Sequence, residues 1–334
     1  MAGYALVCGA GGFIGAHLVR RLKREGYWVR GVDLAAPPHA PSAADEFVIA
    51  DLREPSACRD LFDRRFDEVY QLAADMGGAG YVFAGTSDWD ILSNSTQITL
   101  NVIQASIATD AERLFFASSA CIYPRGNQSD IANPVTREDT AYPADPDSDY
   151  GFEKLYGERL CLAAHRNRGL KVRIARYHNV YGPEGTWRGG REKVPAALCR
   201  KVAEAADGST IEIWGDGRQT RSFLFIDDCL EGTRRLMRSD FIGPVNIGSP
   251  EAVTINELAR MIMGIAGKRL EIIHKPGPEG VRARVSDNDL ALQRLVWSPV
   301  QPLTQGLAVT YRWIARQVAQ SGGRATGFTG ATDG

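Results

Sequence analysis

Short apolar runs alternate with amphipathic stretches along the first half of the chain. The apolar runs predict strands, and the stretches with apolar positions at helical spacing predict helices. The predicted strands are 4–7, 28–32, 46–50, 68–73, 113–118 and 171–176, and the predicted helices are 12–25, 55–65, 91–108 and 149–168. Such alternation is typical of an α/β fold with a doubly wound parallel sheet of the Rossmann type.

The second half is less regular, because Gly- and Pro-rich loops with Arg, Lys and Trp separate its short helices. Loops of this composition usually form binding surfaces. We therefore expect a Rossmann domain over 1–180, joined by parts of 218–250, and a smaller substrate-binding domain over 181–320. The Gly/Thr-rich end, 321–334, is expected to be a disordered tail.

Composition narrows the classes of function. Charged residues make up 24% of the chain and its net charge is −1, which gives no electrostatic footprint for nucleic acid or an anionic membrane. No apolar run approaches the roughly 18 residues of a membrane span, and the chain enters a strand at once, so we expect no signal peptide. Six scattered cysteines without metal-ligand spacing predict reduced thiols, no metal site and a cytoplasmic location.

A glycine-rich turn follows the first predicted strand. In the sequence GAGGFIG (9–15), Gly9 and Gly12 allow a tight turn and a close approach of the backbone, and Gly15 lets the next helix pack on the sheet. The helix N-terminus then faces a pyrophosphate. Because the motif lies between a strand and an amphipathic helix, it predicts a dinucleotide site.

An acidic residue ends the second predicted strand. Asp33 would accept hydrogen bonds from a ribose diol and repel a 2′-phosphate, and no arginine follows it, which favours NAD over NADP. Asp51 and Leu52 follow the third predicted strand and could close the adenine end. The predicted cofactor-binding residues are Gly9, Gly12, Phe13, Ile14, Gly15, Asp33, Asp51, Leu52, Ala73, Tyr150 and Lys154.

Candidate catalytic residues occur in the motif Tyr-x-x-x-Lys, at Tyr150 and Lys154. Their i, i+4 spacing places both side chains on one face of a helix. A nearby ammonium favours ionisation of the phenol, whose ordinary pKa is about 10, and so produces a base. Ser119, at the end of a predicted strand, would bind the same substrate oxygen. Cys121 lies two residues further on, on the same side if the chain is extended.

Together these motifs resemble the extended short-chain dehydrogenase/reductase superfamily, which acts on nucleotide sugars. Longer stretches narrow the resemblance to the GDP-mannose 3,5-epimerase family, and similarity extends from about residue 4 to 316. These stretches are LAADMGG (72–78), ASSACIYP (117–124), RYHNVYGPEGTWRGGREKVPAALCRK (176–201), WGDGRQTRSF (214–223), VNIGS (245–249) and GPEGVRARVSDN (277–288).

The resemblance implies an isomerase in which NAD transiently oxidises C4 of a GDP-hexose. A C4 ketone acidifies the C–H bonds at C3 and C5, and epimerisation there needs an acid and a base. The family's cysteine and lysine for this task match Cys121 and Lys193. The resemblance also implies contacts to the GDP-sugar from Gly77, Ser119, Cys121, Asn179, Glu192, Lys193, Lys201, Gln219, Arg221 and Arg284, the two arginines on the diphosphate.

Two segments depart from the family pattern, since 81–94 and 202–210 are longer. The first follows the DMGG loop near the expected sugar, so the substrate could be a relative such as a GDP-manno-heptose. Epimerisation of one carbon (C3, C4 or C5) and a non-catalytic NAD-binding protein remain alternatives. A dehydratase is disfavoured, because Ala120 and Cys121 stand where that chemistry needs a carboxylate. By analogy, the predicted helices 91–108 and 149–168 would form a homodimer interface.

Overall fold

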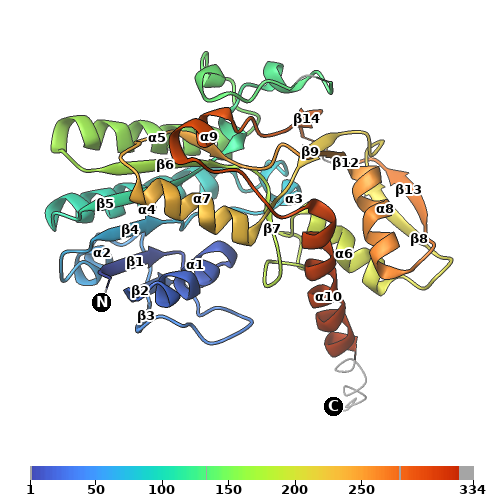
Figure 1. Ribbon diagram of the computed structural model, residues 1–334, viewed down its shortest axis with the longest axis horizontal. Helices are drawn as coiled ribbons and strands as arrows, with labels where there is room; N and C mark the ends of the chain where they lie inside the picture. The colour runs from blue at the N-terminus through green and yellow to red at the C-terminus, as the bar shows by residue number, and fades with distance from the viewer. Residues whose placement is uncertain (1, 133, 278–279, 323–334) are drawn as a thin grey trace, which may run out of the picture.

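The computed structural model describes residues 2–132, 134–277 and 280–322, and within them a seven-stranded parallel sheet forms the centre of the molecule (Figure 1). The strand order is that of a Rossmann fold with one strand added at the edge. In spatial order the strands are β11 (Val245–Ile247), β6 (Val172–Tyr177), β5 (Arg113–Ser119), β4 (Glu68–Gln71), β1 (Tyr4–Cys8), β2 (Trp28–Asp33) and β3 (Glu46–Ile49).

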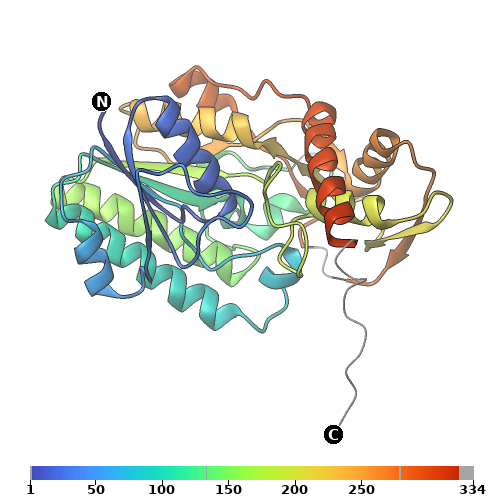
Figure 2. The same ribbon diagram turned by 90° about the horizontal axis from the view of Figure 1, so that it is seen from below.

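Helices cover both faces of this sheet, which lies between them in Figure 2. One face carries α1 (Phe13–Arg24) and α7 (Ile226–Arg238), and the other carries α2 (Pro55–Leu61), α4 (Asp88–Ala108) and α5 (Asp149–Arg168). Each face has its own apolar core, as expected for strands buried on both sides.

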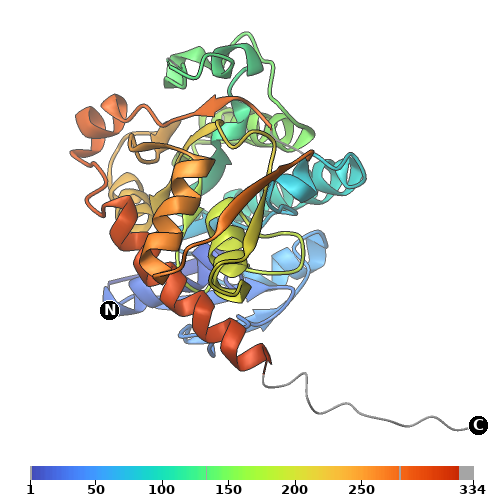
Figure 3. The same ribbon diagram turned by 90° about the vertical axis from the view of Figure 1, so that its right-hand side faces the viewer.

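The remaining elements gather largely at one end of the sheet, on the right in Figure 1 and facing the viewer in Figure 3. The helices are α3 (Ala79–Val82), α6 (Val194–Glu204), α8 (Ile255–Ala266), α9 (Asp289–Leu295), α10 (Leu303–Gly322) and the 3-10 helices η1 (Ala120–Ile122), η2 (Arg125–Gln128) and η3 (Glu138–Ala141). The short strands are β7 (Val180–Tyr181), β8 (Thr210–Trp214), β9 (Thr220–Ser222), β10 (Leu224–Phe225), β12 (Ala252–Thr254), β13 (Glu271–Lys275) and β14 (Ala283–Arg284).

The predicted fold class is confirmed, with strands and helices at the predicted places. The pattern missed β11, because three residues are too few to show a period. It also placed the tail two residues early, since α10 continues to Gly322. The rest of that predicted tail, 323–334, lies outside the described residues. Among the residues described, no helix is both long and apolar enough to cross a membrane.

Local sequence fixes the ends of the helix that carries Tyr150. The Ser148 hydroxyl accepts a hydrogen bond from the Gly151 backbone N–H at 3.3 Å, which caps the start of α5. Gly169 ends the helix with φ of +74°, a conformation that favours glycine. The helix therefore begins one residue before Tyr150, close to the end of β5.

Candidate active site

A cavity of about 810 Å³ lies at the carboxyl ends of β1 and β4, where the chain crosses to opposite sides of the sheet. In doubly wound folds this is the usual place for a ligand. The lining includes Gly9, Gly12, Phe13, Ile14, Gly15, Asp33, Asp51, Leu52, Ala73, Tyr150 and Lys154. The structure therefore brings all the predicted cofactor-binding residues together.

The glycine turn is shaped to hold a pyrophosphate. Gly9 has φ of +85°, and a Cβ on Gly15 would lie 2.0 Å from the Gly9 carbonyl oxygen, so both positions need glycine for the fold. A Cβ on Gly12 would meet no protein atom closer than 3.4 Å. Protein contacts alone do not require glycine there, whereas a dinucleotide lying on the turn does, and the residues thus fit NAD.

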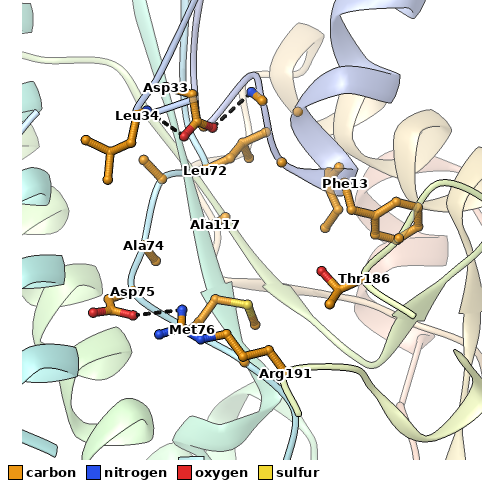
Figure 4. A pocket seen from close by; sticks show the side chains of 18 of the residues that line it. Phe13, Asp33, Leu34, Leu72, Ala74, Asp75, Met76, Ala117, Thr186 and Arg191 are labelled. Carbon is orange, nitrogen blue, oxygen red and sulfur yellow. Dashed lines mark hydrogen bonds and ion pairs between the residues drawn. The ribbon is translucent and has the colours of Figure 1, made fainter. Parts of the chain in front are cut away.

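Asp33 organises the other side of this turn (Figure 4). Its carboxylate accepts hydrogen bonds from the backbone N–H groups of Gly11 at 2.9 Å and Leu34 at 2.7 Å. An arginine does reach the same cavity, Arg53, but its guanidinium is paired with Asp51 at 2.6 Å. The carboxylate of Asp51 thus neutralises the cation that could otherwise receive a 2′-phosphate.

A second cavity, of about 340 Å³, adjoins the first. Its lining includes every predicted substrate-binding residue: Gly77, Ser119, Cys121, Asn179, Glu192, Lys193, Lys201, Gln219, Arg221 and Arg284. Ser119, Tyr150 and Lys193 line both cavities. The expected oxidation and proton-transfer groups therefore meet at the junction between the two.

Tyr150 and Lys154 share one face of α5, as their spacing predicts. The Lys154 Nζ lies 5.6 Å from the centroid of the Tyr150 ring and 5.3 Å from that of Phe116. Lys154 also pairs with its neighbour Glu153, with Nζ 3.3 Å from Oε2. This buried carboxylate could not be predicted from the sequence, because a Glu beside a Lys on a helix is usually exposed.

Cys121 does not continue an extended chain, which corrects the sequence-based expectation. β5 ends at Ser119, and Cys121 lies in the 3-10 turn η1, where its backbone N–H donates to Ser119 Oγ at 3.2 Å. The Cys121 sulfur accepts a hydrogen bond from Arg284 Nη1 at 3.1 Å. Arg284 also pairs with Asp147 at 2.5 Å, and its Nε donates to Gln128 at 2.6 Å.

Comparison with known proteins agrees with this geometry. The pattern of the NAD dependent epimerase/dehydratase family matches residues 5–248. GDP-mannose 3,5-epimerase of Arabidopsis thaliana is 48% identical over 314 residues, which are 93% of this chain and 82% of that protein. The chain belongs to the GDP-mannose 3,5-epimerase family, within the NAD dependent epimerase/dehydratase family.

Solved structures show the same fold with a cofactor or a nucleotide sugar bound. UDP-glucose 4-epimerase of Thermus thermophilus, solved as a complex with NAD, superposes with a TM-score of 0.79 at 26% identity, over 93% of this chain and 98% of that one. UDP-glucose 4-epimerase of Thermotoga maritima, solved with UDP-glucose, gives 0.81 at 25% identity, over 94% and 99%. The epimerase uses NAD as its cofactor.

Burial sets the protonation of the epimerase's site groups. It raises the pKa of the Tyr150 hydroxyl well above its ordinary value; Cys121 and Glu153 raise it further, and a hydrogen bond with Ser119 lowers it. The protein's own groups therefore favour neutral Tyr150, and the expected phenolate needs the positive charge of the nicotinamide as well as that of Lys154. Burial likewise raises the pKa of the Glu153 carboxyl.

Lys193 is, together with Cys121, a candidate acid or base of the epimerase, and both residues line the second cavity. Lys193 precedes α6, and among the described residues no hydrogen bond or ion pair of its ammonium group is found. Burial lowers its pKa, and the nearby Cys121 acts in the opposite direction. A lysine with a lowered pKa can exchange a proton closer to neutral pH than an exposed one.

Four of the polar residues of the second cavity donate to backbone carbonyl oxygens, and Glu192 pairs with a side chain. Lys201 Nζ donates to the carbonyl oxygen of Glu212 at 2.7 Å, and Arg221 Nη2 donates to that of Val281 at 2.6 Å. Burial lowers the pKa of Arg221 to about 10, with Arg284 the next cause. Asn179 donates to Ser222, Gln219 donates to Trp214, and Glu192 pairs with Arg200.

Sequence reasoning missed several residues of the site. A Cβ on Gly11 would lie 2.1 Å from the carbonyl oxygen of Ala35, so this glycine is needed as well as Gly9 and Gly15. Asp147 and Gln128 were missed because they act through Arg284, over 130 residues away in the chain. For Gly11 the sequence contains one signal, the pair of adjacent glycines at 11–12.

Proposed function

We propose that this protein is an NAD-dependent GDP-sugar epimerase that inverts GDP-mannose at C3 and C5 through transient oxidation at C4. The observation that carries this proposal is the junction of the two cavities, which Ser119, Tyr150 and Lys193 line together while Cys121 lines the adjoining substrate cavity. The residues expected to act in oxidation at C4 and those expected to transfer protons at C3 and C5 thus line adjoining parts of the site. The 48% identity to the Arabidopsis enzyme supports the choice of reaction.

The residues divide the work between two kinds of step. Ser119 and Tyr150 bind the oxygen at C4. Tyr150, ionised beside the Lys154 ammonium and the positive nicotinamide of bound NAD, takes the proton of that oxygen on oxidation and returns it on reduction. Bound NAD supplies the acceptance and return of the hydride. With a ketone at C4, Cys121 and Lys193 remove a proton from the neighbouring carbon and deliver one to its opposite face. No net redox change results.

The substrate contacts follow from the charges of the second cavity. Arg221 and Lys201 carry positive charge where the nucleotide diphosphate would lie. Arg284 is engaged with Asp147, Gln128 and Cys121. Arg221 is engaged as well, because it donates to the carbonyl oxygens of Thr220 and Val281. We propose both arginines as diphosphate ligands, with Arg284 also beside Cys121. Residues 1–180 with parts of 218–250 would form the NAD-binding domain, and 181–320 the substrate-binding domain.

The segment 81–94, which is longer than in the family pattern, favours an alternative to GDP-mannose as the substrate. Val82 and Phe83, at its start, line the substrate cavity. A changed wall beside the sugar could admit a larger hexose relative, so GDP-manno-heptose is the alternative substrate. Competition between the two GDP-sugars, compared by kcat/KM, decides which one the enzyme prefers.

Incubation with GDP-mannose in D₂O tests the function. We expect deuterium at C3 and C5; deuterium at a single carbon would indicate a narrower epimerase, and its absence with every GDP-hexose and GDP-heptose would contradict the proposal. Cys121→Ala should abolish exchange while transient C4 oxidation survives. Exchange at the wild-type rate in that variant would remove Cys121 from the reaction.

We also propose a cytoplasmic homodimer formed through α4 and α5. Phe152 and Tyr156 lie one turn apart on α5 and are 46% and 52% exposed. Two such helices from each subunit could bury these rings in a four-helix interface. Molar mass by light scattering tests the dimer, and Phe152→Glu should shift it to monomer.

A further inference from the structure

Two loops from distant parts of the chain meet over the junction of the cavities. One is the loop of residues 72–78 after β4, continued by α3, and the other precedes α6 at residues 182–193. The Gly78 backbone N–H donates to the Arg191 carbonyl oxygen at 2.9 Å. A Cβ on Gly78 would lie 2.2 Å from the Glu192 carbonyl oxygen, so the backbones touch.

Three side chains join the same loops, and we call Asp75, Tyr81 and Arg191 the clasp. The Arg191 guanidinium lies 3.9 Å from the centroid of the Tyr81 ring, and its Nη1 lies 3.4 Å from Asp75 Oδ1. The Tyr81 hydroxyl donates to that same Asp75 oxygen at 2.9 Å. Figure 4 shows Arg191 reaching across the cavity wall to Asp75, with Met76 beside them.

The clasp is fixed on one side by α4, and on the other side it meets a loop with two glycines, in which the Gly190 N–H donates to Glu192 Oε2 at 2.7 Å. Asp75 is held by α4, because the Asn94 side chain donates to its Oδ2 at 3.0 Å and its own N–H donates to Ser95 Oγ at 3.0 Å. The opposite loop carries Gly189 and Gly190 at φ of +96° and +86°, where a Cβ would meet nothing within 4 Å. Arg191 therefore ties a loop with a glycine hinge to a fixed anchor.

The hinged loop carries Lys193, two residues after Arg191. Lys193 lines both cavities, and the described residues give its ammonium group no hydrogen bond or ion pair to fix it. Its position is therefore set by its backbone. We propose that Arg191 is a positioning residue that, through Asp75 and Tyr81, holds Lys193 at the reacting carbon. This inference rests on the proposed function of the site.

The first test is Arg191→Met, which removes the guanidinium but keeps the stem of the side chain. We expect deuterium incorporation at C3 and C5 to fall about ten- to a hundredfold, as for a catalytic group displaced by about 1 Å. C4 oxidation, followed by the absorbance of reduced nicotinamide, should persist, because Ser119, Tyr150 and Lys154 lie outside the hinged loop. Equal losses of oxidation and exchange would overturn the proposal.

Partner variants test the coupling within the clasp. Tyr81→Phe keeps the ring under Arg191 and should retain most exchange, whereas Tyr81→Leu should lose it. Combining Tyr81→Leu with Arg191→Met should cost no more than the worse single change, because both break one contact. Additive losses would show that the two residues act separately and would contradict a clasp.

The matched control is Arg188→Met in the same loop. Arg188 stacks on its neighbour Trp187 and its Nη1 donates to Ser321 at 3.3 Å, and it lines neither cavity. It should leave exchange at the wild-type rate. If Arg188→Met lowers deuterium incorporation as much as Arg191→Met does, any change in this loop has the same effect, and the positioning role of Arg191 is contradicted.

Backbone hydrogen exchange separates this inference from the proposed function. In Arg191→Met, the backbone amides of 189–193 should exchange their hydrogens faster than in the wild type, while the amides of α5 stay unchanged. If the wild-type enzyme incorporates no deuterium into GDP-mannose, the proposed function is contradicted. Faster amide exchange at 189–193 in Arg191→Met would still support the clasp. Unchanged protection of 189–193 overturns the clasp whatever the substrate.

Discussion

Arg284 Nη1 lies 3.1 Å from the sulfur of Cys121, while Nη2 of the same guanidinium lies 2.5 Å from Asp147. β14 thereby brings a buried cation to a thiol more than 160 residues earlier in the chain. Cys121 thus lies beside a positive charge, the setting in which cysteines act as proton carriers or nucleophiles. The pair with Asp147 keeps the guanidinium in place when no substrate is bound.

Breaking this pair should destabilise the fold. Arg284→Met leaves the Asp147 carboxylate buried, and loss of one partner of a buried ion pair typically costs about 3–5 kcal/mol. Urea unfolding followed by circular dichroism would measure the change. Removing both charges, in Arg284→Met with Asp147→Leu, should recover part of the loss. If the double variant is as unstable as the sum of its singles, the two side chains do not interact as an ion pair.

Lys193 should make stability depend on pH with a definite sign. Because burial lowers its folded-state pKa, the unfolded chain binds more protons between that value and the ordinary value of about 10.4. The free energy of unfolding therefore rises with pH across this window, and below it the fold bears the full cost of the half-buried ammonium. Lys193→Met should raise the free energy of unfolding at neutral pH, and the gain should shrink towards pH of about 10.

Exposed Lys171 provides the control for that experiment, since it lies away from both cavities. Lys171→Met should leave the pH dependence of unfolding unchanged. A gain in Lys193→Met that stays constant with pH would show that the lysine titrates normally in the folded protein.

Asp33 should decide between NAD and NADP. Asp33→Asn keeps one of the two oxygens that accept from the Gly11 and Leu34 N–H groups, and it removes the charge that repels a 2′-phosphate. Hydrogen bonds to charged groups are worth about 1.5–3 kcal/mol, so the ratio of NAD to NADP affinity should fall by about tenfold or more. Titration of both cofactors measures the ratio, and an unchanged ratio would mean that Asp33 serves only the glycine turn.

Gly11 should tolerate no side chain. In Gly11→Ala the new Cβ would lie 2.1 Å from the Ala35 carbonyl oxygen, and forced overlap in a packed region costs about 1–3 kcal/mol. Thermal unfolding and NAD binding should both suffer. Gly126→Ala is the matched control, because a Cβ there meets nothing within 4 Å and its φ is not positive. Equal effects of the two changes would contradict the steric argument.

Local patterns in the sequence determined the elements and the cofactor site. The six predicted strands and four helices follow from periods of apolar residues, and the glycine turn with Asp33 follows from a motif contained in one βαβ unit. The predicted cofactor-binding residues line one cavity, because the carboxyl ends of parallel strands share one edge of the sheet. Resemblance to a family supplied the substrate-side residues, which spacing alone could not select.

Only the tertiary structure decided which partners surround those residues. The pairing of Arg284 with Cys121 and Asp147, and the clasp of Arg191 on Asp75 and Tyr81, join segments more than 100 residues apart. The protonation of Tyr150 and Lys193 likewise depends on burial, which cannot be predicted from the identity of the residue. Spacing records neighbours along a helix or strand, whereas contacts across the fold depend on how whole elements pack, and so they emerge only once the chain has folded.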